Sequence, residues 1–292
     1  MRSFYYLATV LCLICGIRSA EINYNNETYS CSEVICDLSC IPYPNLCNHI
    51  AIIGTINETA KTFTPFKTAV ILKNEYMLTT VSSGFATNFD ADVNMIYFSA
   101  KSNGQVSDGF VFTDRQNDKV QLIPGDFDLH GWNDIMLIKL KNRHEHGVDV
   151  VKDAEKLRNA MKKGDNIIRY GFVVKGGKIV LKKNIATESP AKCSQSFAYD
   201  ETIFFDEDLM YCQSDEDAKQ PPTAEQSKWL SGLPVFDTFG DREALVGLRS
   251  IQSNDHHHQH VFLVTKLKYH CAWIAYHDAL PCVGKFFYYK FK

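Results

Sequence analysis

Residues 133–140 have the sequence Asn-Asp-Ile-Met-Leu-Ile-Lys-Leu, in which Asp134 comes directly before a run of apolar residues. A short apolar run of this kind is typical of a buried β-strand. Further along the chain, residues 230–235 have the sequence Leu-Ser-Gly-Leu-Pro-Val. Here Ser231 and a glycine precede another apolar pair. These two stretches decide the predicted fold, because they are spaced within a long series of similar β-rich runs.

That series extends through most of the chain as short apolar and β-branched runs separated by polar turns. Regular spacing of short strands favours an all-β barrel or sandwich. Two stretches have helical patterns instead, residues 153–163 and residues 268–279, and the second carries Trp273 and Ile274 on its apolar side. The predicted strands are 68–72, 76–81, 95–98, 109–112, 120–123, 135–140, 167–174 and 179–181.

The first twenty residues predict a secretory signal peptide. Arg2 is followed by an apolar run over residues 4–17 and by small residues at Ser19 and Ala20. The run is short for a membrane span, and no later segment reaches the roughly 20 apolar residues that a transmembrane helix needs. We therefore expect a secreted, extracellular protein without a transmembrane segment.

The cysteines are consistent with an oxidising compartment. Eight of the ten follow the predicted signal, an even number that suits disulfides. Residues 21–51 hold four of them and predict a small disulfide-stapled segment, either a compact prodomain or an N-terminal tether. The pairing stays open at this stage, and so do bonds to the two C-terminal cysteines. The cysteines concerned are Cys31, Cys36, Cys40, Cys47, Cys271 and Cys282.

Glycosylation sequons and the net charge indicate which class of partner to expect. Sequons for N-glycosylation begin at Asn26 and Asn57. The formal net charge is −3 and the basic residues are scattered, so the chain lacks the broad basic footprint of a nucleic-acid-binding protein. We therefore expect a protein partner rather than DNA or RNA.

Several blocks, taken in order over about residues 52 to 277, resemble the chymotrypsin/trypsin family of serine proteases. Residues 52–55, Ile-Ile-Gly-Thr, are similar to the mature N-terminus, and residues 76–83, Tyr-Met-Leu-Thr-Thr-Val-Ser-Ser, are similar to the histidine block. The two opening stretches resemble the aspartate and serine blocks. Cys193 and Cys212 resemble the loop disulfide before the specificity pocket, and residues 263–267 with Trp273-Ile274 resemble the closing strand and helix.

The resemblance implies an all-β fold of two packed six-stranded antiparallel β-barrels with a C-terminal helix and a site in the cleft between them. It places the trypsin-like domain at residues 52–280, after the Cys-rich segment 21–51. A basic, aromatic tail follows at residues 281–292, which is either an adhesive surface patch or an edge strand.

The same resemblance places the catalytic triad at Ser82, Asp134 and Ser231, with a serine where the histidine should be. A serine hydroxyl is a poor nucleophile until a histidine removes its proton, and the aspartate orients that histidine. Ser82 is not basic near neutral pH, so Ser231 has no general base. Loss of a triad member typically costs about 10⁴-fold or more in rate.

Two further parts of the catalytic apparatus are altered in this register. Trp229 stands where the family has the glycine that donates to the oxyanion, and its indole is expected to crowd the cleft. Leu230 stands where an aspartate pairs with the newly freed N-terminus. Ala51, before Ile52, is not the basic residue after which activation cleavage occurs. The chain is therefore not expected to be a conventional zymogen.

Other family positions are replaced in a coherent way. One conserved cysteine pair falls at Lys67 and Ser83, so both ends of that bond are lost together. Glu225 and Ser250 fall at the former specificity pocket, but with its framing cysteines gone we assign no specificity. We expect Asp134 to have a structural role, since an aspartate at the start of a strand satisfies nearby backbone donors.

Two alternatives assign chemistry to this chain. In the first, Ser231 is a residual hydrolase nucleophile with a relocated base, for which His130 is the nearest candidate by sequence. In the second, a His-rich loop binds zinc or copper, although its spacing matches no closed structural zinc motif and a solvated loop is the expected form. The loop histidines are His256, His257, His258 and His260.

The leading expectation is a secreted, catalytically inactive serine protease homologue without a cofactor. It would act by binding an extracellular protein, such as an active protease or an inhibitor, as a regulator, cofactor or decoy in a protease or immune pathway.

Overall fold

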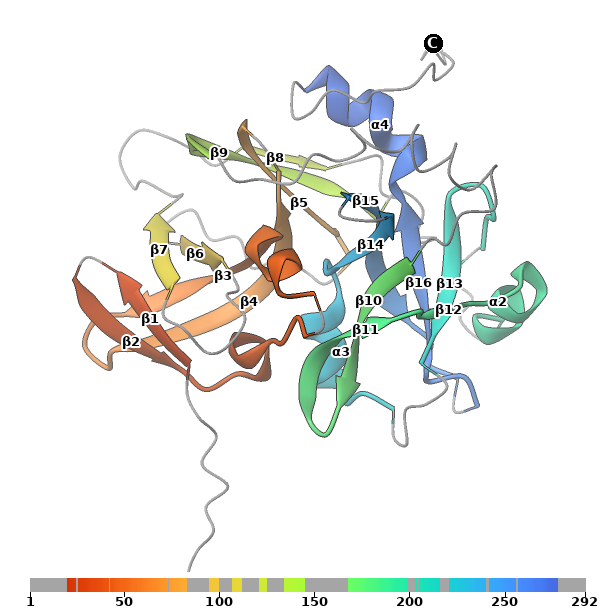
Figure 1. The fold of residues 1–292 in the computed structure, drawn as a ribbon, viewed down its shortest axis with the longest axis horizontal. Coiled ribbons are helices and arrows are strands. Elements are labelled where there is room, and N and C mark those ends of the chain that lie inside the picture. Colours follow the sequence, from red (N-terminus) through yellow and green to blue (C-terminus); the bar gives the residue numbers. More distant parts are fainter. Residues whose placement is uncertain are drawn as a thin grey trace, which may run out of the picture.

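The computed structural model describes the chain from residue 20 to residue 277 with several gaps. The described residues form two β-sheets, three α-helices and two short 3₁₀-helices (Figure 1). Several parts of the chain named in the sequence analysis lie outside these residues. They are the predicted signal peptide apart from Ala20, the predicted helix 153–163, the tail 281–292, His130, His256 and Cys282. The described ranges are 20–24, 26–41, 43–72, 74–82, 95–99, 107–111, 121–124, 134–144, 168–198, 203, 205–215, 221–239, 242–255 and 257–277.

The first sheet has nine strands in the order β2-β1-β7-β6-β3-β4-β5-β9-β8. Its centre is the antiparallel pair β3 and β4, whose residues are mostly buried and rich in isoleucine, valine and threonine. The bounds are β1 Ala20–Tyr24, β2 Glu27–Cys31, β3 Ile50–Asn57, β4 Thr62–Ile71, β5 Asn74–Thr79, β6 Met95–Ser99, β7 Ser107–Val111, β8 Gln121–Pro124 and β9 Met136–His144.

The second sheet has seven strands in the order β11-β10-β14-β15-β16-β13-β12 and curls into a half-barrel (Figure 1). All of its pairings are antiparallel. The bounds are β10 Ile168–Lys175, β11 Lys178–Lys183, β12 Ala186–Thr187, β13 Met210–Ser214, β14 Pro234–Phe239, β15 Arg242–Gln252 and β16 Val261–Lys266. The all-β class is thus confirmed, although the described strands do not establish two six-stranded barrels.

The α-helices are α2 Pro190–Ser196, α3 Ala224–Leu230 and α4 Leu267–Tyr276, and the 3₁₀-helices are η1 Val34–Asp37 and η2 Pro44–His49. Helix α4 follows β16 directly, close to the predicted C-terminal helix, and buries Ile274 while Trp273 packs against the core. One hydrophobic core joins both sheets, with Leu78 from β5 and Phe172 from β10 in the same cluster. Within the described ranges, no helix is long and apolar enough to cross a membrane.

The N-terminal segment, residues 20–49, is built into both sheets. Strand β2 pairs with β4, and β1 pairs with β7, in the first sheet. Ser39 then forms a bridge to Val180 of β11 in the second sheet, and Asp37 lies 2.6 Å from the Nζ of Lys178. The segment is therefore neither a separate prodomain nor a free tether, because it contributes strands and core residues to the main fold.

Its cysteines pair with their neighbours. Cys31 bonds to Cys36 and Cys40 bonds to Cys47, which settles the alternatives left open by the sequence. Cys271 is also disulfide-bonded. The three disulfides with both ends described, including Cys193–Cys212, are typical of proteins from an oxidising compartment.

The stretch that resembles a mature N-terminus lies inside a strand. Ile52 lies inside β3, fully buried, and pairs with Thr68 of β4 on one side and with Phe98 of β6 on the other. Cleavage before Ile52 would cut a central strand of the sheet. The isoleucine pair that suggested an activation site is instead explained by strand packing.

Candidate functional site

The sequence-predicted triad positions meet where the two sheets face each other. Asp134 is completely buried just before β9, and its carboxylate accepts four hydrogen bonds. One carboxylate oxygen, Oδ1, accepts from the backbone N–H groups of Val81 at 2.6 Å and Ser82 at 2.7 Å. The other, Oδ2, accepts from the Ser82 hydroxyl at 2.5 Å and from the Ser250 hydroxyl. Both oxygens are therefore fully used within the protein.

The Ser82 hydroxyl occupies the position from which a base would have to act. It donates to Asp134, so the carboxylate orients a hydroxyl that has no basicity near neutral pH. The structure brings together Ser82, Asp134 and Ser250. The sequence register grouped Ser82 with Asp134 but assigned Ser250 to the former specificity pocket. Asp134 holds the loop after β5 and strand β15 against β9, which is a structural task.

Ser231 lies at the C-terminal end of α3 and is buried, with only 6% of its surface exposed. Its Oγ lies 2.9 Å from Oγ1 of Thr80, and its carbonyl accepts a hydrogen bond from Thr68 at 2.8 Å. No hydrogen bond among the described residues joins Ser231 to Ser82 or Asp134. Ser231 is therefore held by threonines and not by the other two positions of the predicted triad.

A buried lysine completes this network. The Nζ of Lys67 donates to Oγ1 of Thr80 at 2.9 Å, and the Lys67 side chain is almost wholly removed from solvent. Burial lowers the pKa of Lys67 to about 8, although attraction to Asp134 offsets part of that shift. Sequence analysis singled out this position only as a lost cysteine and gave no sign of a buried amine beside the serine.

The backbone amide of Ser231 is committed to the helix. Helix α3 begins with a capping box, in which Thr223 and Gln226 bond reciprocally. At the other end, the Ser231 N–H donates to the Ser227 carbonyl at 3.2 Å. An oxyanion hole needs this N–H to be free and aimed at the substrate. In this conformation the serine amide is not available for that purpose.

Trp229 and Leu230 fill the core beneath the site. Both are at most 3% exposed and belong to the hydrophobic cluster that joins the sheets. The Trp229 indole, which the sequence register places in a cleft, is instead packed in this core together with Leu230. The Trp229 Nε1 is buried and has no hydrogen-bond partner in the described part of the chain.

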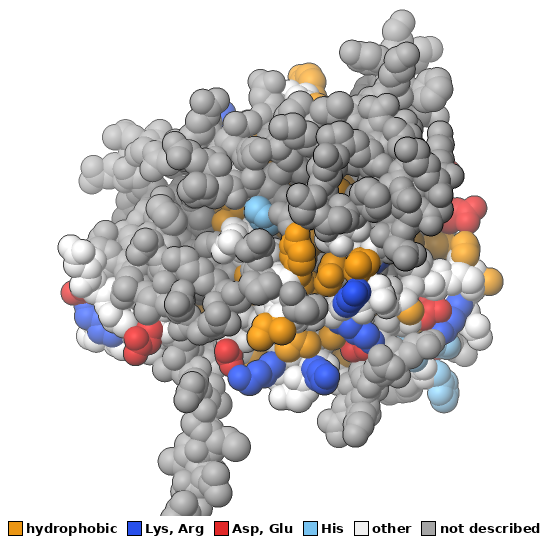
Figure 2. All heavy atoms as spheres, in the orientation of Figure 1, with side chains coloured by type: hydrophobic (Ala, Val, Ile, Leu, Met, Phe, Trp, Pro, Cys, Tyr) orange, Lys and Arg blue, Asp and Glu red, His pale blue; other side chains and the backbone are white. Residues whose placement is uncertain are grey.

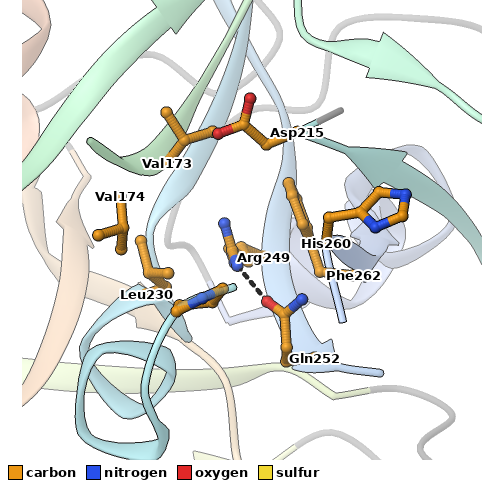
Figure 3. A pocket seen from close by; sticks show the side chains of 9 residues that line it. Val173, Val174, Asp215, Leu230, Arg249, Gln252, His260 and Phe262 are labelled. Atoms are coloured by element: carbon orange, nitrogen blue, oxygen red, sulfur yellow. Dashed lines mark hydrogen bonds between the residues drawn. The ribbon is translucent and has the colours of Figure 1, made fainter. Parts of the chain in front are cut away.

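The cavity beside Leu230 is occupied by an arginine. Arg249, next to Ser250, is 4% exposed and donates to the Phe172 carbonyl at 2.7 Å and to the Gln252 side chain. Its guanidinium lies 3.6 Å from the centre of the Phe262 ring. Figure 3 shows these side chains converging on the middle of the cavity. Burial lowers the pKa of Arg249 to about 9, and attraction to Asp215 partly offsets this.

The remaining predicted residues lie away from Asp134. Cys193 and Cys212 form the predicted disulfide between α2 and β13. Glu225 is in the first turn of α3, and its side chain lies outside the described residues. Asn26 and Asn57 are both exposed, Asn26 between β1 and β2 and Asn57 at the end of β3.

The His-rich loop connects β15 to β16. Asp255 organises it, since Oδ1 accepts from the His257 backbone N–H at 3.0 Å and Oδ2 lies 2.6 Å from Nδ1 of His258. These hydrogen bonds, the one from His257 first, lower the pKa of Asp255. His260 is among the residues that line the Arg249 cavity. Among the described residues no three potential metal ligands gather, and His256 is not one of those residues.

Gly232 fixes the backbone directly after Ser231. Its φ is +89°, and an added Cβ would lie 2.6 Å from the Thr68 carbonyl oxygen and 2.7 Å from Oγ1 of Thr79. Both the conformation and the close approach require glycine.

We therefore expect Gly232→Ala to lower the free energy of unfolding by about 2 kcal/mol, from left-handed strain plus a backbone clash. Gly176→Ala is the matched control, because Gly176 also has a positive φ but has open space around its Cα. That variant should cost only about 1 kcal/mol. Urea unfolding followed by circular dichroism measures both, and equal losses would show that the contacts around Gly232 contribute nothing.

Comparison with known proteins leaves the family unassigned: no protein-family model and no curated protein matches this chain.

Proposed function

We propose that this protein is a trypsin-like serine protease homologue without peptidase activity, which acts by binding another extracellular protein. The observation that carries the proposal is the Ser82 hydroxyl bonded to Asp134, where catalysis needs a histidine. The mostly β architecture with a curled half-barrel sheet is compatible with that fold. The disulfides suit secretion.

Three further features support the loss of activity. The Ser231 amide is bonded to Ser227, so it does not offer an oxyanion donor. The Ser231 side chain is buried, which leaves little room for a scissile carbonyl. The cavity beside the neighbouring residue, Leu230, is filled by the Arg249 side chain, which packs against Phe262. An active hydrolase would need all three to change together.

The expected partner is an extracellular protein such as an active protease or its inhibitor. Loss of chemistry with retention of the fold leaves surface recognition as the remaining use of this scaffold. The role as a regulator, cofactor or decoy follows from the resemblance to inactive protease homologues.

We expect the purified secreted protein not to react with a fluorophosphonate probe, because labelling requires a serine whose proton is removed by a base. An active trypsin-like enzyme serves as the positive control and Ser231→Ala as the negative control. In-gel fluorescence and intact mass measure the labelling. Labelling that disappears in Ser231→Ala would refute the proposal.

One observation favours a residual hydrolase as the second candidate. The chain Lys67–Thr80–Ser231 is continuous, and an amine whose pKa lies near 8 is partly neutral at physiological pH. Neutral Lys67 would accept the serine proton through the Thr80 hydroxyl. Labelling of Ser231 that rises between pH 7 and 9 and is lost in Lys67→Met would support this candidate.

A further inference from the structure

A groove lies at the β10–β11 hairpin, separate from the residues around Asp134 and Ser231. It has a volume of about 850 Å³, which lies within the range of ligand-binding sites. The hairpin forms its floor, the N-terminal segment around Ser39 and Ile41 forms one wall, and the residues leading into α3 form the other. Its position at the meeting point of three segments makes it a concave feature and not a flat surface.

The groove is positively charged. Among the described residues, Lys175, Lys182 and Lys183 line it, and Asp215 is the one acidic residue in that part of the lining. Asp215 is already paired, with Oδ1 at 2.5 Å from the Nζ of Lys182. Lys175 and Lys183 are exposed. Figure 2 shows Lys and Arg side chains, in blue, beside hydrophobic side chains, in orange, in the lower middle of the face that it draws. The described part of the lining therefore carries an excess of positive charge open to solvent.

The inner end of the groove reaches the Arg249 cavity. Val173, Val174 and Asp215 line both spaces, so the two are neighbours. Arg249 is a buried cation whose hydrogen bonds go to a carbonyl and an amide and not to a carboxylate. Asp215 attracts it but is shared with Lys182. Because one Asp215 carboxylate faces two cations, Lys182 and Arg249, its charge does not balance both, and Arg249 adds to the positive potential at this end of the groove.

Apolar groups line the groove together with the cations. Val174 and Val180 are half-buried on its floor, and Ile41, on the wall, is 64% exposed. A sulfated sugar would interact only with the cations of this lining. An extended peptide can offer carboxylates to the cations and apolar side chains to the apolar groups. The mixed lining favours the peptide.

We propose that this groove binds an extended acidic segment of the partner protein, with glutamate or aspartate side chains on the exposed Lys175 and Lys183. The inference rests on the proposed function, because it names the surface through which a non-catalytic homologue would bind. It gives the partner a chemical character that the sequence alone does not.

The test uses the full secreted chain and fluorescein-labelled hexaglutamate, with hexaglutamine as the uncharged control peptide. Fluorescence anisotropy should show saturable binding of hexaglutamate alone, weakening steeply between 20 and 300 mM salt because exposed charges are screened. In the double variant Lys175→Glu and Lys183→Glu, affinity should fall at least tenfold. Lys268→Glu is the matched control, since Lys268 is an exposed lysine on α4 that does not line the groove, and it should leave affinity within twofold.

Three outcomes would overturn the proposal: no binding of hexaglutamate at low salt, equal binding by the double variant and the wild type, or a heparin hexasaccharide that binds more tightly than the peptide and is lost in the same variant. Thermal unfolding of each variant checks that the fold is retained. Fluorophosphonate labelling of the same preparation separates the two hypotheses. A labelled Ser231 refutes the proposed function whatever the peptide does, whereas absent labelling with absent peptide binding refutes only the groove.

Discussion

Replacing Asp134 by alanine is expected to lower the free energy of unfolding by about 3–5 kcal/mol, the largest effect of any single substitution considered for this protein. The carboxylate is wholly buried and accepts from two backbone amides and two hydroxyls. Truncation would leave those donors without an acceptor, and each unsatisfied buried group costs about 1–3 kcal/mol. The amides of Val81 and Ser82 lie near the surface and recover some water, which limits the total.

The asparagine variant is the matched control. Asp134→Asn keeps one acceptor oxygen for the backbone amides, and its NH₂ group donates to hydroxyls that rotate to accept. We therefore expect a loss of only about 1 kcal/mol. Urea unfolding of the three proteins at pH 7 measures both effects. In an active serine protease the asparagine variant keeps its fold and loses activity, so a large alanine effect with no activity to lose identifies Asp134 as structural. An alanine effect under 1 kcal/mol would contradict this assignment.

The local geometry of the site was predictable because short sequence blocks determine it. Asp134 opens a strand, and Ser82 follows another strand by three residues, so pairing of β5 with β9 brings the two together. The Cys193–Cys212 disulfide was predicted from its resemblance to the loop disulfide of the protease family. Closeness in sequence alone was not enough, because the pairings Cys31–Cys36 and Cys40–Cys47 stayed open although their ends lie closer together.

Other features depend on contacts that sequence separation hides. Residues 52–55 resemble a mature N-terminus, yet the isoleucine pair Ile52 and Ile53 is equally suited to the buried strand β3. Residues 20–49 carry little hydrophobic periodicity, so their pairing with strands of both sheets could not be read from the sequence. Local patterns do not report which distant edge a segment will join.

Buried charges were the hardest features to predict. A lysine or arginine in a strand is ordinarily taken to face solvent. Lys67 and Arg249 are buried because their positions in β4 and β15 face the interior of the assembled sheets. Lys67 reaches Thr80, and Arg249 reaches the Phe172 carbonyl. Only the assembled sheets show that these side chains have polar partners inside.

Lys67 makes stability depend on pH in a defined window. Burial lowers its pKa from 10.5 in the unfolded chain to about 8 in the folded protein. Below pH 8 the amine is protonated in both states, so its contribution does not change with pH. Between pH 8 and pH 10.5 the unfolded chain binds more protons than the folded protein, and stability therefore rises with pH. A difference of this size corresponds to a rise of about 3 kcal/mol.

The variant Lys67→Met isolates this effect, because methionine fills a similar volume without a charge. At pH 7 it should be at least as stable as the wild type, since replacing a buried ion by an apolar residue is often neutral or stabilising. Urea unfolding at intervals from pH 7 to pH 10.5 should then show the wild type gaining about 3 kcal/mol relative to the variant. Taking the difference removes contributions from other groups, including Arg249, whose pKa is also lowered. Parallel curves would mean that Lys67 is solvated in the folded protein, and the Lys67–Thr80–Ser231 network, with the residual hydrolase built on it, would have to be abandoned.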